Sequence, residues 1–264
     1  MTFSPRTETY VNVSSISSPY NITVTKPTGT VDGDILFCWL GFYKTSAMTV
    51  GSVPSGWQLL GEYLTNSDKY ALYYKVASGE PASWVWSFST TGKVRAVCSC
   101  YTGGDFNASN PINVVSNTPY RTSGTPCIAT TMNVANANSP LIFWGGVYST
   151  TVRTFTKPSI PTTGWVEDDD AGSTTPDFST EVCSMIWAGS GATGDMSATI
   201  STSLATKHAF AVALNPAQGV PISGQFNKLA YATEPPTTGA FNKLKFASEP
   251  PVVSSWNKLL YDGE

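Results

Sequence analysis

The chain has 264 residues, enough for one large β domain or two small ones. Charged residues make up only 12% of it and the net charge is −3, with no basic stripe, which argues against a nucleic-acid partner. No segment is long and apolar enough for membrane insertion, and the first residues lack a signal-peptide pattern. We therefore expect synthesis in a cytoplasm without export by that route.

Strand patterns follow one another along the chain, whereas helical periodicity is almost absent. Residues 34–43 form a nearly continuous apolar run, which is typical of a strand buried on both faces. Further strand patterns, separated by clusters of Gly, Pro, Asn and Ser, lie at 70–76, 83–88, 94–101, 141–148, 182–187 and 207–214. The sequence therefore predicts an all-β fold, an antiparallel two-sheet sandwich of jelly-roll-like form.

The region before residue 217 repeats itself at a spacing of roughly 105–115 residues. The matched segments are DILFCWLGFY (from Asp34) with SPLIFWGGVY (from Ser139), PSGW (from Pro54) with PTTGW (from Pro161), YYKVASG (from Tyr73) with MIWAGSG (from Met185), and VRAVCSCY (from Val94) with KHAFAVAL (from Lys207). We expect a body at 1–216 with pseudo-repeats at about 23–115 and 127–216. The halves either supply equivalent strands to one sandwich, which we favour, or form two similar lobes.

The cysteines and the single histidine suggest structural roles. Five cysteines lie mostly inside apolar strand-like runs: Cys38, Cys98, Cys100, Cys127 and Cys183. Their odd number and the lack of CxxC pairs favour small core side chains over disulfides or zinc ligands. His208 shares a strand face with apolar residues, and no GxSxG elbow accompanies it. We therefore predict no catalytic residues, no cofactor and no enzyme activity.

One acidic run is the only candidate metal site. Glu167, Asp168, Asp169 and Asp170 follow Trp165 directly. Carboxylates packed in one run suit water or Ca²⁺ better than they suit the two sides of a sugar, so catalysis is disfavoured. We expect a solvated loop, with a calcium site as the weaker alternative.

Two tryptophans hold matching places in the repeats. Trp57 and Trp165 each follow a glycine in a turn. If exposed, their rings could stack on sugars; the favoured alternative is that each closes one end of the sandwich.

The sequence pattern changes after residue 216, and we expect residues 217–264 to form a C-terminal arm. A motif of the FNKLxY type occurs three times with a period of 15 residues, and Pro-Pro closes the first two copies. The apolar residues of the motif are Phe226, Leu229, Tyr231, Phe241, Leu244, Phe246, Trp256, Leu259 and Tyr261. Units this short cannot cover their own rings, so we predict that these residues mediate oligomerisation or docking, with a homotrimer as the expected assembly.

The body resembles a domain common in tailed-bacteriophage structural proteins and in some bacterial surface proteins. The resemblance runs from Thr23 to Pro216 and rests on TVTKPTGTVDGDILF, PSGW, YYKVASGEPASWVWSFS, YTGGDFNASNPI and HAFAVALNP. The arm is similar to NK(V/L)xY motifs of phage tail and baseplate proteins. The resemblance implies binding or scaffold modules with no shared catalytic residue.

These observations predict a non-enzymatic virion protein, assembled in the cytoplasm of a bacterial host. Its expected partners are copies of itself and other virion proteins. A tail-fibre or baseplate position is slightly favoured over a role as a capsid decoration protein. A glycan-binding module that recognises host surface polysaccharide is the second alternative.

Overall fold

The structure, a computed structural model, describes residues 3, 5–13, 15–43, 48–64, 68–116, 124–173, 177–202 and 207–217. The chain divides into two units, Met1–Gln218 and Gly219–Glu264. The second unit lies outside the described residues, and with it all nine residues predicted to mediate docking. No helix in the described ranges has the length and hydropathy needed to cross a membrane.

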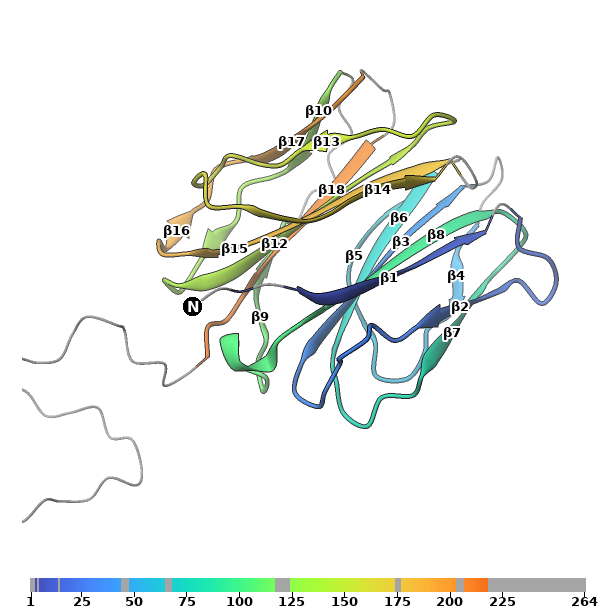
Figure 1. Ribbon diagram of the computed structural model, residues 1–264, viewed down its shortest axis with the longest axis horizontal. Helices are drawn as coiled ribbons and strands as arrows, with labels where there is room; N and C mark the ends of the chain where they lie inside the picture. The colour runs from blue at the N-terminus through green and yellow to red at the C-terminus, as the bar shows by residue number, and fades with distance from the viewer. Residues whose placement is uncertain are drawn as a thin grey trace, which may run out of the picture. The chain divides into compact units, whose positions relative to one another are not determined.

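The first lobe is an antiparallel sandwich of a five-stranded and a three-stranded sheet (Figure 1). Its strands are β1 (Pro5–Val13), β2 (Asn21–Thr25), β3 (Ile35–Tyr43), β4 (Val50–Ser52), β5 (Gln58–Leu64), β6 (Asp68–Val76), β7 (Ser83–Phe88) and β8 (Lys93–Tyr101). The sheet orders are β1-β8-β3-β6-β5 and β2-β7-β4. A short 3-10 turn, η1 (Gly103–Asp105), follows β8.

The second lobe has the same kind of sandwich with one additional ribbon. Its strands are β9 (Ile112–Val115), β10 (Pro126–Ala129), β11 (Asn133–Val134), β12 (Ser139–Tyr148), β13 (Phe155–Thr156), β14 (Val166–Ser173), β15 (Phe178–Trp187), β16 (Gly191–Ala192), β17 (Met196–Ile200) and β18 (Lys207–Leu214). The sheet orders are β14-β15-β12-β18-β9 and β10-β17-β13, and β11 pairs with β16.

The two lobes correspond strand for strand. In the five-stranded sheets, β9, β18, β12, β15 and β14 take the places of β1, β8, β3, β6 and β5. Each lobe therefore follows a jelly-roll order, with its first strand beside its last. The predicted all-β antiparallel class with an internal repeat is confirmed. The favoured arrangement, in which both halves supply strands to one sandwich, is wrong: the structure has two similar lobes, each with its own pair of sheets.

The ladders refine the sequence alignment of the repeats. Cys38 of β3 pairs with Tyr73, and Phe143, which matches Cys38, pairs with Cys183. Tyr73 therefore corresponds to Cys183, two residues before the Met185 that the sequence match indicated. A shift of two residues keeps every side chain on its face of the sheet, which explains why the apolar pattern alone did not reveal it.

Apolar side chains fill three layers. One lies between the two sheets of the first lobe, one between the sheets of the second, and a third between the two five-stranded sheets. This third layer covers the second face of β3 and β12, which is why both strands are apolar along almost their whole length. All five cysteines are free and buried, as predicted.

The central strands β3 and β12 run in the same direction across the interface between the lobes. The Phe37 ring lies 4.8 Å from that of Trp144, and the Tyr43 and Tyr148 rings stack with centroids 4.0 Å apart. Between these two contacts, Trp39 lies against Gly146, where a Cβ would come within 2.2 Å of the indole. The lobes therefore pack with equivalent ends pointing the same way.

The first and last described parts of the body meet at one end. Phe3 stacks on Tyr101 at the end of β8, with ring centroids 4.7 Å apart. Beyond β18, Asn107 donates its backbone N–H to the Asn215 carbonyl at 2.9 Å, and Phe106 forms a β-bridge with Pro216. At the same end, Ala217, the last described residue, donates its backbone N–H to the Asp105 carbonyl at 3.4 Å.

Candidate functional site

The acidic run lies on a strand and not in a solvated loop, so the loop prediction is wrong. It occupies β14, an edge strand, with a bulge between Glu167 and Asp169. Glu167 is exposed, whereas Asp168, Asp169 and Asp170 are half-buried and accept hydrogen bonds from the protein. No group of three His, Cys, Asp or Glu side chains within the described ranges is placed to hold a metal ion, so the calcium alternative gains no support.

Two of these carboxyls contact the first lobe. Tyr101 donates its hydroxyl to Asp168 Oδ2 at 2.9 Å, and burial raises the pKa of Asp168 to about 7. The Tyr10 hydroxyl lies 2.6 Å from Asp169 Oδ1 and 2.8 Å from Glu8 Oε2. Burial, followed by the charge of Asp169, raises the pKa of Glu8 to about 8. The acidic run therefore joins the lobes.

A buried arginine completes this group. The Arg95 guanidinium, 1% exposed, donates to Asn12 Oδ1 at 2.9 Å and to Thr180 Oγ1 at 3.1 Å. It also lies over the Tyr10 ring, 5.4 Å from the centroid. Burial lowers its pKa. We call this edge of the interface the polar seam: Glu8, Tyr10, Arg95, Tyr101, Asp168, Asp169 and Thr180.

The opposite edge of the interface is made of rings. His208 is fully buried, with its ring 5.4 Å from Tyr70, 5.2 Å from Tyr63 and 4.1 Å from Phe210. Neither imidazole nitrogen has a hydrogen-bond partner among the described residues, and burial lowers the pKa of His208 to about 3. We call these four residues the aromatic seam. His208 is structural, as predicted, but its polar atoms are not satisfied.

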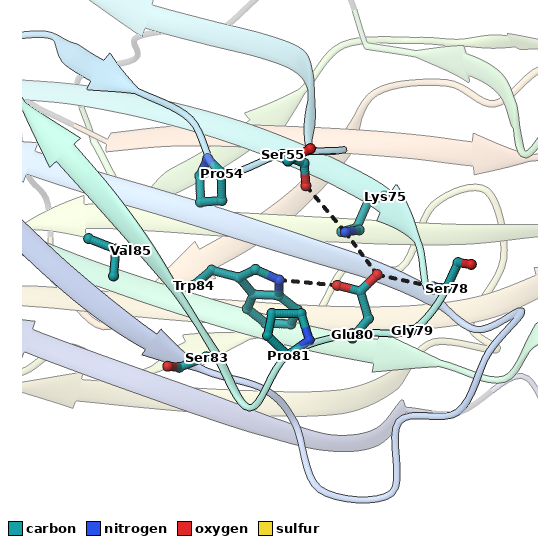
Figure 2. Close-up of a pocket in the computed structure, with 10 residues that line it drawn as sticks. All are labelled: Pro54, Ser55, Lys75, Ser78, Gly79, Glu80, Pro81, Ser83, Trp84 and Val85. Carbon is teal, nitrogen blue, oxygen red and sulfur yellow. Dashed lines mark hydrogen bonds and ion pairs between the residues drawn. The ribbon is translucent and has the colours of Figure 1, made fainter.

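An open hollow of about 400 Å³ lies at the end of the first lobe, between the β4–β5 and β6–β7 loops (Figure 2). Lys75 and Glu80 form an ion pair at its base, with Nζ and Oε1 2.8 Å apart. Serine hydroxyls, prolines and the exposed Val85 line the rest. The hollow thus combines hydroxyl groups with small apolar surfaces.

Glu80 is fully engaged in holding these loops. Its Oε1 accepts from the Ser78 backbone N–H at 3.0 Å, and its Oε2 accepts from Trp84 Nε1 at 3.1 Å (Figure 2). Lys75 Nζ also donates to the Ser55 carbonyl at 3.3 Å. Each carboxylate oxygen therefore has a donor, and the pair fixes the walls of the hollow.

The two candidate sugar-stacking tryptophans lie in the cores of their lobes. Trp57 is 7% exposed and packs edge-on against Trp84, with centroids 5.1 Å apart. Trp165 is 2% exposed and donates its indole N–H to the Ile160 carbonyl at 2.8 Å. Neither ring has a free face for a sugar, so the structure contradicts their assignment as glycan contacts. Each closes one end of a sandwich, the alternative favoured from the sequence.

Several residues of these sites escaped the sequence analysis. Glu8, Arg95 and Glu80 carry no local motif. The partners of Arg95, Asn12 and Thr180, lie on other strands. No protein-family model, curated protein or solved structure matches the chain.

Proposed function

We propose that this chain is a non-enzymatic structural and adhesive component of a tailed-bacteriophage virion, in which the body is displayed and the C-terminal repeats mediate oligomerisation or docking. One observation carries the proposal. The last described residues of the double sandwich include Asn215 and Pro216, which lie beside Asn107 and Phe106, and the sequence that follows repeats an aromatic motif with a constant spacing. This is the organisation expected of a displayed head joined to an assembly segment.

The position in the particle is a finer part of the proposal. The similarity of the arm to phage tail and baseplate motifs favours a tail-fibre or baseplate protein that assembles as a homotrimer. A capsid decoration protein is the alternative, and its arm would lie across capsid subunits.

Light-scattering mass in solution tests the role of the arm. The full chain is compared with a chain ending at Gln218, which retains all three apolar layers. A full-length trimer that becomes a monomer without the arm supports an assembly segment in a fibre-like part. Monomers in both cases remove the trimer and shift the proposal to capsid decoration.

Glycan recognition is a second candidate function, supported by the hollow and not by Trp57 or Trp165. Small-molecule sites commonly combine apolar walls with a few placed polar groups, and the hollow has both. Lys75→Ala should then weaken binding of the full chain to host polysaccharide, whereas Lys157→Ala, an exposed lysine of the second lobe, should not. Equal binding by both variants would exclude the hollow as the sugar site.

A further inference from the structure

The polar seam holds the two lobes together at β1 and β14, the edge strands of their sheets. Three hydrogen bonds cross it. Tyr10 bonds Asp169 at 2.6 Å, Tyr101 bonds Asp168 at 2.9 Å, and Arg95 bonds Thr180 at 3.1 Å. All three acceptors belong to the second lobe and all three donors to the first.

The hydrogen bonds of Tyr10 require an additional proton. A phenol has one hydrogen, yet the Tyr10 oxygen lies within hydrogen-bond distance of both Glu8 Oε2 and Asp169 Oδ1. Both contacts are satisfied only if Tyr10 donates to one carboxyl and accepts a proton from the other. Glu8 is the better proton carrier, because its Oε1 is buried without a partner, which is costly for a carboxylate.

The charges around the seam point to the same conclusion. β1 contributes Glu8 and Tyr10, β8 contributes Arg95 and Tyr101, and β14 contributes Asp168 and Asp169; the residue from β15, Thr180, does not titrate. Three carboxyls therefore face one guanidinium. Full ionisation would leave a surplus of two negative charges in a half-buried space, so proton uptake by the cluster is favoured.

We propose that the polar seam is a proton-operated latch, in which the hydrogen-bond chain from protonated Glu8 through Tyr10 to Asp169 keeps β1 against β14, and loss of that proton in mild alkali releases the two strands from each other. Deprotonated Glu8 and Asp169 would compete for the single Tyr10 hydrogen and repel each other. Tyr10 is 41% exposed, so water and hydroxide reach this edge without unfolding of the lobes. The apolar layer between the sheets keeps the lobes joined when the latch opens.

The direction of the pH effect follows from linkage. The pKa of Glu8 is about 8 in the folded protein, against an ordinary value of 4.5, and the pKa of Asp168 is raised to about 7. The folded state therefore binds more protons than the unfolded state between these values. The contribution of the latch is complete below about pH 4.5 and is lost as pH rises towards 8.

Amide hydrogen exchange of β1, corrected for the intrinsic effect of pH, tests the latch in the full chain. From pH 6 to pH 9 we expect the protection of β1 to fall by about tenfold or more, while β3 keeps its protection. Glu8→Gln keeps a donor for Tyr10 at every pH and should abolish the fall. Glu167→Gln, on the exposed side of the same acidic run, should leave it unchanged.

A second variant covers the case in which Glu8→Gln does not fold. Asp169→Asn keeps an acceptor for Tyr10 but removes the charge that opposes ionisation of Glu8, so the pKa of Glu8 should fall and the loss of protection should shift to lower pH or shrink. The latch is refuted if wild-type β1 keeps its protection to pH 9. It is equally refuted if Glu8→Gln, or Asp169→Asn in its place, follows the wild-type curve.

Discussion

The two seams of the interface occupy equivalent places in the duplicated fold, yet hydrogen-bonded charges close one and stacked rings close the other. Arg95 of β8 pairs with Gly41 of β3, and His208 of β18 pairs with Gly146 of β12, the equivalent glycine. Tyr70 pairs with Gly41, and Thr180 pairs with Gly146, so Tyr70 and Thr180 are equivalent residues of the two lobes. Thr180 accepts a hydrogen bond from Arg95, whereas Tyr70 stacks on His208. The same backbone frame thus supports both kinds of contact.

The comparison shows what duplication conserves in this molecule. The bulge of β5 after Leu59 recurs in β14 after Glu167, so even the irregularities of the frame are repeated. The side chains beyond the bulge differ: Asp169 bonds Tyr10, whereas its counterpart Gly61 lies against the ring of Phe210. Strand order and register are shared by the lobes, and the chemistry of each seam is set by a few side chains.

The largest expected effect comes from breaking the polar seam at its cation. Arg95→Leu removes the positive charge that faces Glu8 and Asp169, and should lower the free energy of unfolding by about 3–5 kcal/mol at pH 7. Denaturant unfolding measures the change. Arg153→Leu, a half-buried arginine of the second lobe, serves as the control and should cost about 1 kcal/mol or less. Equal costs would mean that the buried charge has no special role.

A smaller effect is expected from the apolar layer that both seams flank. Gly146→Ala places a methyl group about where Trp39 now lies, with 2.2 Å to the nearest ring atom. Overpacking of this kind should lower the free energy of unfolding by about 1–3 kcal/mol. Gly104→Ala, where no atom lies within 4 Å of the added carbon, is the matched control. A thermal unfolding midpoint unchanged in both variants would contradict the close packing of the lobes.

The aromatic seam should respond in the opposite sense. His208→Phe replaces two buried, unpartnered nitrogens with apolar carbon and should raise the free energy of unfolding by about 1 kcal/mol at pH 7. Because the folded pKa of His208 is about 3, below its ordinary 6.5, wild-type stability declines as pH falls between these values. Urea unfolding at pH 7 and pH 4 should therefore show a larger gain for the variant at pH 4. An equal gain would mean that the pKa of His208 is the same in the folded and unfolded states.

The smallest effect distinguishes the two tryptophans that close the sandwiches. Trp165→Phe removes the donor to the Ile160 carbonyl, whereas Trp57→Phe removes an indole N–H that has no partner. We expect Trp165→Phe to cost about 1 kcal/mol more. Denaturant midpoints of the two variants give the difference. A greater cost for Trp57→Phe would contradict a stabilising hydrogen bond at Trp165.

The apolar strands could be predicted from the sequence because burial on both faces leaves a long uninterrupted run. Residues 34–43 and 207–214 correspond closely to β3 and β18. The edge strands β1 and β14 could not, since each carries polar residues of the seam, and the apolar residues of β1, Val11 and Val13, are only partly buried against the core. Their burial therefore does not alternate with a simple period, and the acidic run on β14 read as a loop.

The contacts of the two seams could not be predicted from the sequence for a different reason. Tyr10 and Asp169 are 159 residues apart, and Arg95 and Thr180 are 85 apart. Neither pair forms part of a motif, so only the packing of one lobe on the other brings them together. The repeat of Trp39-x-Gly41-x-Tyr43 as Trp144-x-Gly146-x-Tyr148 was visible, but its role as the lobe interface needed the structure.

The position of β18 determines how the body would carry mechanical load. The strand lies inside its sheet, bonded to β12 on one side and to β9 on the other, and it leads directly to Asn215 and the chain beyond. Because ladder hydrogen bonds are perpendicular to the strands, a pull directed along β18 would load them together in shear instead of opening one bond at a time. A force along β18 would therefore be shared by the ladders with β12 and β9.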